Sequence, residues 1–434
     1  MDRSFSRHKL TESQKGLIYE IVSGVVRWKG YLTWILSRYV KKAVKSELKY
    51  LLWVSLYQIS FMKKGAYHIV NESVGYAKDE HGAYIGNFVN AVLRNFIRET
   101  ETLNHRPVPD MYGTENPPGS ILPEAGQSQA SSIKYQASSI KHQVLNLSIL
   151  YSFPEWLVRK WSKRFGYDET VKLLTVLNKS PEFGIRVNLN RISMDEVTRC
   201  LEDKGVRTRK GRFLESALYV DRLTPVLKDE LFKKGFIHIQ DEASQLAGLS
   251  TSTLVKKGGL VLDACAGSGT KTEQLKDVIA GAAVVAMDIE MKRLKLTASE
   301  IKRVKGDAVD SPFKDGVFDV ILLDAPCSSF GIISKHPEIK WRRMEKDIAA
   351  FGNYQFNLLK SLWRKLKKGG CLVYSVCSFE PEETVNIVER FRKEESFMLE
   401  NPLPFLFNKN MEYYLSFPHE TAMDGFFIAR LRKK

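Results

Sequence analysis

The chain has 434 residues, enough for two or three domains, and 44% of them are hydrophobic, as in a folded globular protein. No apolar run approaches the length of a membrane span, and the first residues lack the apolar core of an export signal, so neither a membrane partner nor secretion is expected. The net charge of +16 favours a polyanionic partner, most often a nucleic acid, over a surplus kept only for solubility.

The five cysteines, without an export signal, predict a reducing compartment, the cytoplasm. None of them forms a Cys-x-x-Cys pair or joins a Cys/His cluster, so no metal site is expected. Nothing in the sequence reports the oligomeric state, and a monomer is the default expectation.

Residues 1–100 predict an all-α domain. Apolar residues recur at helical spacing from about residue 11 to residue 99, and no alternation typical of strands interrupts them. Basic residues outnumber acidic ones here, as expected of a module that faces a nucleic acid. An ordinary solvated helix face explains each basic residue equally well. The candidate phosphate contacts are Arg27, Lys29, Lys63, Lys64, Arg94 and Arg98.

Residues 101–143 are rich in Pro, Gly, Ser and Gln and contain a near-repeat, QASSIKY followed by QASSIKH. This composition offers little to bury, so the stretch predicts a flexible linker. Residues 144–245 mix helical and strand patterns and predict a small α+β domain. Its strand-like runs are Phe183–Asn188 and Gly235–Gln240, and Ser193 is placed to cap a helix.

From residue 246 to residue 434, short apolar runs alternate with helical patterns, which is typical of an α/β fold with a doubly wound parallel sheet. A last strand-like run, Asp424–Leu431, suits the edge of the sheet or a terminal hairpin. The other predicted strands are Leu260–Asp263, Ala283–Asp288, Val304–Ala308, the run that ends at Asp324 and the run that ends near Cys377.

Two of these strands end in a cysteine. One apolar run leads directly into the sequence DAPC, from Asp324 to Cys327, and the other leads into SVCS, which contains Cys377. Polar groups at the carboxyl ends of buried parallel strands point into the crevice where open α/β sheets bind ligands. A lone cysteine is most often a small buried hydrophobe. Two cysteines at strand ends, each followed by serine, instead predict a reaction centre made of Cys327, Cys377 and Asp324.

A loop rich in small residues follows the first strand of this sheet, where it would let the backbone approach a ligand and open a helix. It matches neither the phosphate loop nor the dinucleotide fingerprint. The candidate cofactor-binding residues in it are Cys265, Ala266, Gly267, Ser268, Gly269, Thr270 and Lys271.

Two further carboxylates extend this loop into a cofactor pattern. Asp288 ends the second strand about 20 residues beyond the glycines, where an acidic side chain accepts ribose hydroxyls. Asp307 ends the third strand, where a carboxylate can accept the amino group of adenine. Each Asp could simply cap a strand end. Together with Asp324 they favour an adenosine ligand without phosphates, such as S-adenosylmethionine.

In these motifs the chain resembles the RsmB/Sun family of S-adenosylmethionine-dependent ribosomal RNA (cytosine-5) methyltransferases, within the NOL/NOP/Sun group. The catalytic motifs, in family order, are LVLDACAGSGTKT, VVAMDIE, GDA, LLDAPCSSFG, HPEIKW, YSVCSFEPEE and DGFFIARL. RVN and IQDEASQL resemble the small preceding domain, and GVVRWKGYL and GNFVNAVLRNFIRE resemble the NusB-like helical domain. The resemblance covers nearly the whole chain. It implies a Rossmann-like methyltransferase domain at 246–434, preceded by a NusB-like RNA-binding domain and a small α+β domain.

The resemblance also implies a reaction: methyl transfer to carbon 5 of a cytosine in 16S ribosomal RNA through a covalent cysteine adduct. Cys377, in the second cysteine motif, is the expected nucleophile, and Cys327 would assist removal of the carbon 5 proton or release of the product. Asp324 would hydrogen-bond the cytosine, and Lys271 would place that carboxylate and lower the thiol pKa. The sequence alone leaves open which cysteine attacks, because DNA enzymes use the one that follows a proline, here Cys327.

The chain departs from the family pattern at three places. The usual Pro-Gly-Gly of the cofactor loop is Ser268-Gly269-Thr270, Val376 replaces the usual threonine before Cys377, and the NusB-like part starts late, so a first helix is expected to be missing. Three other functions stay open: a DNA cytosine-5 methyltransferase, a non-catalytic RNA-binding or antitermination factor, and a small-molecule methyltransferase. The two-cysteine layout argues against the DNA enzyme, and the intact cysteine motifs argue against the non-catalytic factor. The charge and the two extra domains argue against the small-molecule enzyme.

Overall fold

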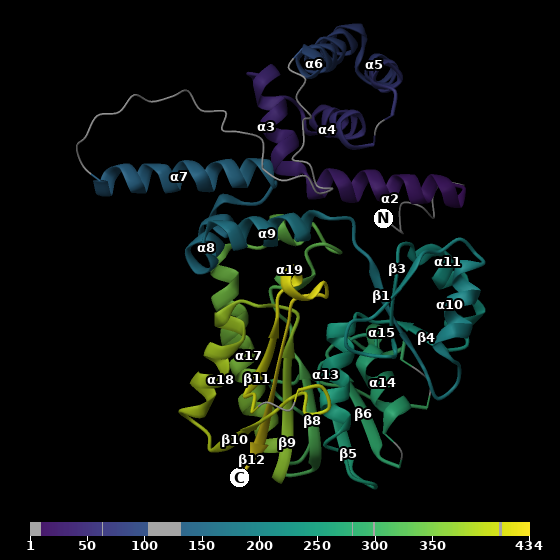
Figure 1. Ribbon diagram of the computed structural model, residues 1–434, viewed down its shortest axis with the longest axis vertical. Coiled ribbons are helices and arrows are strands. Elements are labelled where there is room, and N and C mark those ends of the chain that lie inside the picture. Colours follow the sequence, from purple (N-terminus) through teal and green to yellow (C-terminus); the bar gives the residue numbers. More distant parts are fainter. Residues whose placement is uncertain (1–9, 63, 103–131, 280, 298–299, 408–409) are drawn as a thin grey trace. The chain divides into compact units, whose positions relative to one another are not determined.

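The computed structural model describes residues 10–62, 64–102, 132–279, 281–297, 300–407 and 410–434 (Figure 1). The chain divides into two compact units, Met1–Lys179 and Ser180–Lys434. In these ranges the first unit contains helices and the second contains two β-sheets. No helix in the ranges given is both long enough and apolar enough to span a bilayer.

The helices between residues 12 and 102 pack around one apolar core, as the periodicity of residues 1–100 predicts. The first of them starts with a capping box, in which Thr11 and Gln14 exchange hydrogen bonds with each other's backbone. Trp28, Leu32 and Leu52 are almost fully buried in the core. The helices are α2 (Glu12–Arg27), α3 (Lys29–Tyr39), α4 (Ser46–Phe61), α5 (Ala66–His81), α6 (Ala83–Thr102), α7 (Ser132–Leu150), α8 (Glu155–Phe165) and α9 (Tyr167–Asn178).

The prediction that Arg27 contacts phosphate is wrong. Its side chain is buried at the end of α2, and its guanidinium donates to the carbonyl oxygen of Lys179 at 2.9 Å. Burial lowers the pKa of Arg27 to about 10. Helical spacing within one segment cannot show that the end of a later helix covers this position. Lys63 lies outside the described residues, and Lys29, Lys64, Arg94 and Arg98 remain candidates.

The predicted flexible linker, 101–143, is corrected at both ends. Helix α6 runs to Thr102 and α7 begins at Ser132, while residues 103–131 lie outside the described residues. The predicted absence of a first helix concerns residues before residue 10, which also lie outside the described residues. The Ser- and Gln-rich composition concealed the apolar spacing that continues to Val144 and Leu147, which are buried. Helices α8 and α9, predicted to belong with the small domain, fall within the compact unit that ends at Lys179.

The smaller sheet of the second unit is antiparallel, with strand order β2-β3-β1-β4. The longest helix beside this sheet is capped by Ser193, as the sequence predicts, and Ser193 forms a capping box with Glu196. The elements are β1 (Phe183–Val187), α10 (Met194–Glu202), β2 (Thr208–Lys210), β3 (Ala217–Val220), α11 (Leu223–Lys228), α12 (Glu230–Lys233) and β4 (Ile237–Ile239).

The larger sheet has the order β10-β12-β9-β8-β5-β6-β7, with β11 beside β12. Its strands are β5 (Leu260–Asp263), β6 (Ala283–Asp288), β7 (Lys302–Lys305), β8 (Phe318–Asp324), β9 (Leu366–Val376), β10 (Phe397–Glu400), β11 (Tyr413–Ser416) and β12 (Phe426–Lys433). The helices between and around them are α13 (Glu242–Ser252), α14 (Thr270–Val278), α15 (Met291–Leu294), α16 (Ile339–Arg342), α17 (Glu345–Lys365), α18 (Val385–Arg392) and α19 (Pro418–Thr421), with 3-10 turns η1 (Phe330–Ile332) and η2 (Pro381–Glu383).

Both faces of this sheet are covered, as its continuous apolar runs predict. On β8, Ile321 and Leu323 belong to the core that contains α17 and α18. Their neighbours Val320 and Leu322 belong to the core that contains α13 and α14. The two sets alternate because successive strand residues point to opposite faces.

The parallel strands reverse their order beside β5. The chain proceeds from β5 to β6 and β7 on one side, and then returns to form β8 and β9 on the other side. Open α/β sheets bind ligands at the carboxyl ends of the strands at such a reversal. Asp263 ends β5 and Asp324 ends β8, so both lie at this point.

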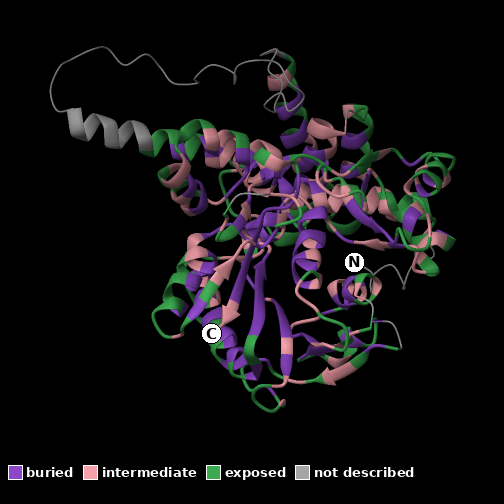
Figure 2. Cartoon of the chain, turned by 60° about the horizontal axis from the view of Figure 1, so that its bottom comes forward, coloured by how far each residue is buried: buried purple, intermediate pink, exposed green. Residues whose placement is uncertain are grey.

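Of the two positions predicted for Asp424–Leu431, the edge of the sheet is wrong, whereas the terminal hairpin is confirmed by the antiparallel pairing of β12 with β11, the strand before it in the chain. Strand β12 lies inside the sheet, antiparallel to β9 on one side and to β10 and β11 on the other. Figure 2 shows buried residues along the central strands, and Phe427, Ile428 and Leu431 are fully buried. An apolar run with no alternation marks a strand covered on both faces, and this signal outweighs its place near the end of the chain.

Candidate active site

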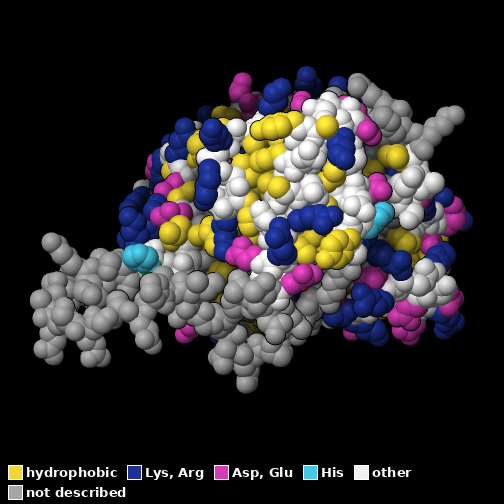
Figure 3. Space-filling view, turned by 90° about the horizontal axis from the view of Figure 1, so that it is seen from above, with side chains coloured by type: hydrophobic (Ala, Val, Ile, Leu, Met, Phe, Trp, Pro, Cys, Tyr) yellow, Lys and Arg dark blue, Asp and Glu magenta, His cyan; other side chains and the backbone are white. Residues whose placement is uncertain are grey.

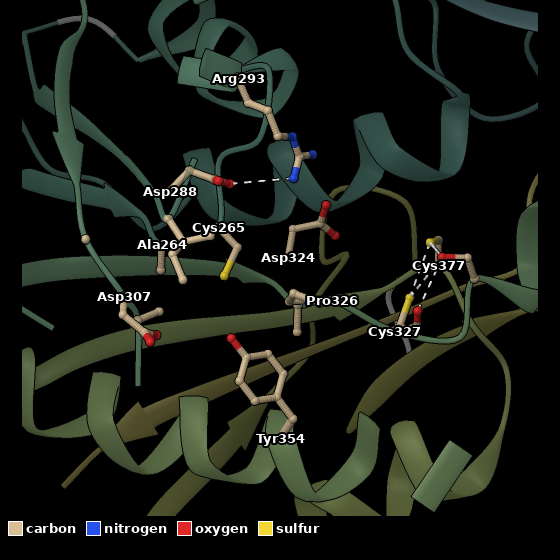
Figure 4. A pocket seen from close by; sticks show the side chains of 15 residues that line it. Ala264, Cys265, Asp288, Arg293, Asp307, Asp324, Pro326, Cys327, Tyr354 and Cys377 are labelled. Atoms are coloured by element: carbon tan, nitrogen blue, oxygen red, sulfur yellow. Dashed lines mark hydrogen bonds and ion pairs between the residues drawn. The ribbon is translucent and has the colours of Figure 1, made fainter. Parts of the chain in front are cut away.

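The loops after β8 and β9 bring two thiols together. The strands are parallel neighbours in which Asp324 pairs with Ser375, so their carboxyl ends lie side by side. Three residues beyond Asp324 and two beyond Ser375, Cys327 Sγ and Cys377 Sγ are 3.4 Å apart (Figure 4). The Ser329 hydroxyl lies 3.5 Å from Cys377 Sγ. Both cysteines line one cavity, so the arrangement can present two sulfur atoms to a single bound group.

The two thiols differ in exposure. Cys327 is buried and Cys377 is partly exposed. The Cys377 thiol beside it, together with burial, raises the pKa of Cys327 well above its ordinary value. Cys327 is therefore kept as a neutral thiol, while Cys377 is the more accessible sulfur.

A carboxylate–ammonium pair lies next to the thiols. Lys271 Nζ, from the first turn of α14, donates to Asp324 Oδ2 at 2.6 Å, and the Ser375 hydroxyl donates to Asp324 Oδ1 at 3.0 Å. Burial lowers the pKa of Lys271, but the Asp324 carboxylate, with Asp263 and Cys377, raises it by more in total, so the pKa lies above its ordinary value and the amine stays charged. The pair can present one oriented carboxylate to a polar ring in the cavity.

The other end of the cavity carries the predicted cofactor residues Cys265, Asp288 and Asp307. Asp288 Oδ2 accepts a hydrogen bond from the backbone N–H of Gly267 at 2.8 Å, which ties the small-residue loop to the end of β6. Asp307 Oδ1 accepts one from Val309 N–H at 2.9 Å. The loop residues that do not line the cavity are Ala266, Gly267, Ser268, Gly269, Thr270 and Lys271.

Gly269 shapes this loop through its backbone. It has φ +84° and lies at the N-cap of α14, a left-handed conformation that glycine adopts without strain. A Cβ at this position would lie 2.4 Å from Thr297 Oγ1. The loop therefore packs too tightly for any side chain at residue 269. The carboxylates of Asp288 and Asp307 beside this small-residue turn suit a ribose and an adenine amino group, so the residues present fit S-adenosylmethionine.

Sequence reasoning missed several cavity residues. Arg293 lies five residues after Asp288 on α15, and its guanidinium is 3.9 Å from the Asp288 carboxylate. Tyr354, on α17, points its ring toward the cavity in Figure 4. Neither had a signal, because helical spacing does not say which exposed side chain meets a distant strand end. Two other cavity residues did have a sequence signal, because they lie close to the predicted thiol of Cys327. They are Pro326, inside the DAPC motif, and Ser329, two residues after Cys327.

Comparisons with known proteins agree with this geometry. Residues 253–432 match the family model described as 16S rRNA methyltransferase RsmB/F, residues 2–98 match the NusB family, and residues 153–227 match the ferredoxin-like domain of RsmF/B-like methyltransferases. Over 99% of its length the chain is 30% identical to the ribosomal RNA small subunit methyltransferase B of Pasteurella multocida and to that of Vibrio cholerae, covering 90% and 92% of those proteins. This chain belongs to the RsmB/F family of 16S rRNA methyltransferases.

Solved structures show the same fold as this RsmB/F family member. The crystal structure of PH0851 matches 100% of the chain and 93% of its own at a TM-score of 0.76 and 24% identity. The structure of NSun6 from Pyrococcus horikoshii with SFG matches 65% of the chain and 99% of its own at a TM-score of 0.57 and 22% identity. The predicted family and fold class, and S-adenosylmethionine as cofactor, are confirmed. The chain is an S-adenosylmethionine-dependent rRNA methyltransferase.

Proposed function

We propose that this RsmB/F family member methylates carbon 5 of a cytosine in 16S rRNA through a covalent adduct with Cys377. The observation that carries the proposal is the pair of thiols, 3.4 Å apart, beside the Asp324–Lys271 pair in one cavity. Single-cysteine chemistry would need only one of the two sulfur atoms at the end of this cavity. Two adjacent thiols suit a reaction in which a sulfur–carbon bond forms and then breaks.

Carbon 5 of cytosine is a poor nucleophile. Addition of the Cys377 thiolate to carbon 6 makes carbon 5 enamine-like, and so divides one difficult step into two easier ones. S-adenosylmethionine supplies the methyl group when it is bound. The accessibility of Cys377, compared with the buried Cys327, supports its assignment as the nucleophile.

Cys327 then takes part in the second half of the reaction. Once Cys377 is bonded to carbon 6, the hydrogen bond that contributes most to the raised pKa of Cys327 is lost. As a thiolate, Cys327 can then accept the carbon 5 proton, and the electrons of that C–H bond restore the ring double bond as the bond from Cys377 to carbon 6 breaks. Its sulfur lies beside that bond. The neighbouring Ser329 hydroxyl gives the proton a further hydrogen-bonding partner 3.8 Å from Cys327 Sγ.

Asp324 and Lys271 orient the base. An Asp324 carboxylate fixed on both oxygens can accept from the exocyclic amine of cytosine and stabilise a proton on the ring nitrogen. At the other end of the cavity, Asp288, Asp307 and the loop around Gly269 would hold the ribose and adenine of the cofactor. The loop residues from Cys265 to Thr270 would also help to hold the cofactor at this end of the cavity.

The charge of the chain supports an RNA partner. Figure 3 shows Lys and Arg side chains at several places on one face, interspersed with apolar side chains. We propose that the helical and α+β regions before residue 246 present the RNA, whose target base must be exposed before a thiol can reach it. The free cysteines are consistent with a reducing cytoplasm, which is the proposed location. The proposed oligomeric state is a monomer.

The proposal is tested with labelled S-adenosylmethionine and three polymers: 16S rRNA, another RNA and duplex DNA. Label should enter 16S rRNA as 5-methylcytosine, which bisulfite sequencing locates. The Cys327→Ala variant should accumulate an RNA–protein adduct that survives a denaturing gel, while Cys377→Ala should give neither adduct nor product. Cys200→Ala, on α10, is the matched control. Trapping by the Cys377 variant instead would reverse the two roles, and label in DNA would reject the substrate.

A further inference from the structure

A buried glutamate joins the two cysteine loops from behind. The serines that follow the cysteines, Ser328 and Ser378, are fully buried, so their hydroxyls point into the protein and not into the cavity. The two hydroxyl oxygens are 3.2 Å apart. Glu383, at the end of η2, is also fully buried and meets both of them.

The Glu383 carboxylate accepts hydrogen bonds from both loops. Oε1 accepts from the Ser328 backbone N–H at 2.6 Å, and Oε2 accepts from the Ser328 hydroxyl at 2.5 Å and from the Ser378 hydroxyl at 2.6 Å. The Gln355 amide donates to Oε1 at 3.4 Å and also to the carbonyl oxygen of Pro326 at 2.9 Å. One side chain therefore connects residues directly adjacent to each thiol.

Glu383 is itself held in place. Tyr374, fully buried in β9, donates from its hydroxyl to the Glu383 carbonyl oxygen at 2.6 Å. The Glu383 N–H donates to the carbonyl oxygen of Glu380 at 3.0 Å. Burial raises the pKa of the Glu383 carboxyl, and its hydrogen bonds from Ser328 and Ser378 oppose that rise. Such a costly buried acid is retained only where its partners satisfy it.

The loop after Cys327 needs such a constraint. Ser329 has φ +65°, a left-handed conformation that costs free energy for a residue with a Cβ. Conformations of this kind persist where surrounding contacts over-determine them. The hydrogen bonds from Ser328 to Glu383 are among those contacts, so their loss would free both the loop and the sulfur it carries.

We propose that Glu383 is a positioning residue that maintains the separation of the Cys327 and Cys377 thiols through Ser328 and Ser378. It does not line the cavity, so it acts through these serines and not on the base. The inference rests on the proposed function for its effect on turnover. Its effect on the distance between the sulfurs does not depend on any substrate.

The thiol separation is measured directly by cross-linking. Hydrogen peroxide converts two thiols into one disulfide and two waters (2 R–SH + H2O2 → R–S–S–R + 2 H2O), and the bond forms only between sulfurs that can approach in the right geometry. Glu383→Ala should slow formation of the Cys327–Cys377 disulfide by about tenfold or more, followed by mass spectrometry of the peptides. Titration with S-adenosylmethionine should give a Kd within about twofold of wild type, because the cofactor end of the cavity is untouched.

Turnover supplies the second readout. Glu383→Ala should lower kcat by about a hundredfold, as expected for a misplacement of about 1 Å, with KM for RNA and cofactor nearly unchanged. Glu383→Gln should recover most of this loss. Its amide oxygen accepts from the Ser328 N–H, and its amide nitrogen can donate to the serine hydroxyls, which also accept. A general loss of packing would raise KM and lower kcat together and would not be rescued.

Ser361→Ala is the matched control, because this buried hydroxyl on α17 does not contact Glu383 and should leave both readouts unchanged. If Glu383→Ala does not fold, the double variant Ser328→Ala/Ser378→Ala removes the same hydroxyl contacts and should also slow cross-linking. An unchanged cross-linking rate overturns the inference, whatever the turnover. If the wild-type enzyme transfers no methyl group to RNA, the proposed function fails, and the cross-linking comparison still decides the role of Glu383.

Discussion

The two ends of the cavity are built in different ways. At the thiol end, side chains from segments far apart in the chain make hydrogen-bond contacts with one another: Cys327 with Cys377, Lys271 with Asp324, and Ser328 with Glu383. At the cofactor end, the carboxylates accept from backbone N–H groups instead, as Asp307 does from Val309 and Asp288 does from Gly267. Substitutions at the first end should therefore change kcat, and those at the second should change cofactor affinity. Three substitutions test this division, the first two at the thiol end, and a fourth tests a buried acid below the cofactor loop.

The largest effect is expected from Lys271→Met. This variant leaves the Asp324 carboxylate without its ammonium partner, so the base is no longer oriented, and kcat should fall by about a hundredfold. Single-turnover methyl transfer measures it. Lys276→Met, on the same helix but exposed, is the control and should be close to wild type. A large rise in cofactor Kd with unchanged kcat would place Lys271 at the cofactor end instead.

Gly331→Ala should separate the thiols without touching the cofactor. A Cβ there would lie 1.9 Å from the carbonyl oxygen of Gly425, so the η1 backbone after Cys327 must shift. We expect kcat to fall by about tenfold, and the unfolding free energy by about 1–3 kcal/mol, as for overpacked sites. Rapid-quench kinetics and denaturant unfolding measure the two. An unchanged disulfide rate in this variant would show that the loop yields without moving Cys327.

Gly269→Ala is the reciprocal test at the cofactor end. The left-handed φ and the contact with Thr297 both penalise a Cβ, and about 1–2 kcal/mol of strain corresponds to roughly a tenfold rise in cofactor Kd. Calorimetric titration with S-adenosylmethionine measures it. The Cys327–Cys377 cross-linking rate should stay within about twofold of wild type. If both change together, the two ends are not independent and the division is wrong.

The smallest effect concerns Asp263, below the cofactor loop. Burial raises its pKa from 3.8 to about 7, although the Thr272 hydroxyl donates to it at 2.7 Å. Between about pH 4 and pH 7 the folded chain therefore keeps a proton that the unfolded chain has lost, so this residue's contribution to stability falls as pH rises through that window. Asp263→Asn should remove the fall and gain at least about 1 kcal/mol relative to wild type between pH 4 and pH 8. Thermal unfolding against pH measures it, with the exposed Asp310→Asn as control. Parallel curves for wild type and Asp263→Asn would contradict a proton held by Asp263 in the folded chain.

Much of the active site could be read from local pattern. Buried strands are recognisable from short apolar runs, and their carboxyl ends form one edge of a parallel sheet, so Asp324, Cys327 and Cys377 could be assigned to one place before any coordinates. The glycine at residue 269 was likewise readable, because a turn between a strand and a helix needs a residue that tolerates positive φ. Membership of the chain in a known family extended these assignments to a reaction.

Other features had no local signal. Nothing in Pro381-Glu382-Glu383 says which glutamate turns inward, and this depends on how η2 packs behind both cysteine loops. Arg27 looked like a surface cation until the end of α9 covered it.

Whether a segment forms a helix or a strand follows from periodicity, because the spacing of apolar residues is a property of the sequence itself. The order of the strands does not, as the interior position of β12 shows. Distances between side chains, such as the 3.4 Å between the two sulfurs, follow from how separate segments pack. Burial, proton affinity and hydrogen-bond partners at this site therefore emerge only when those segments meet.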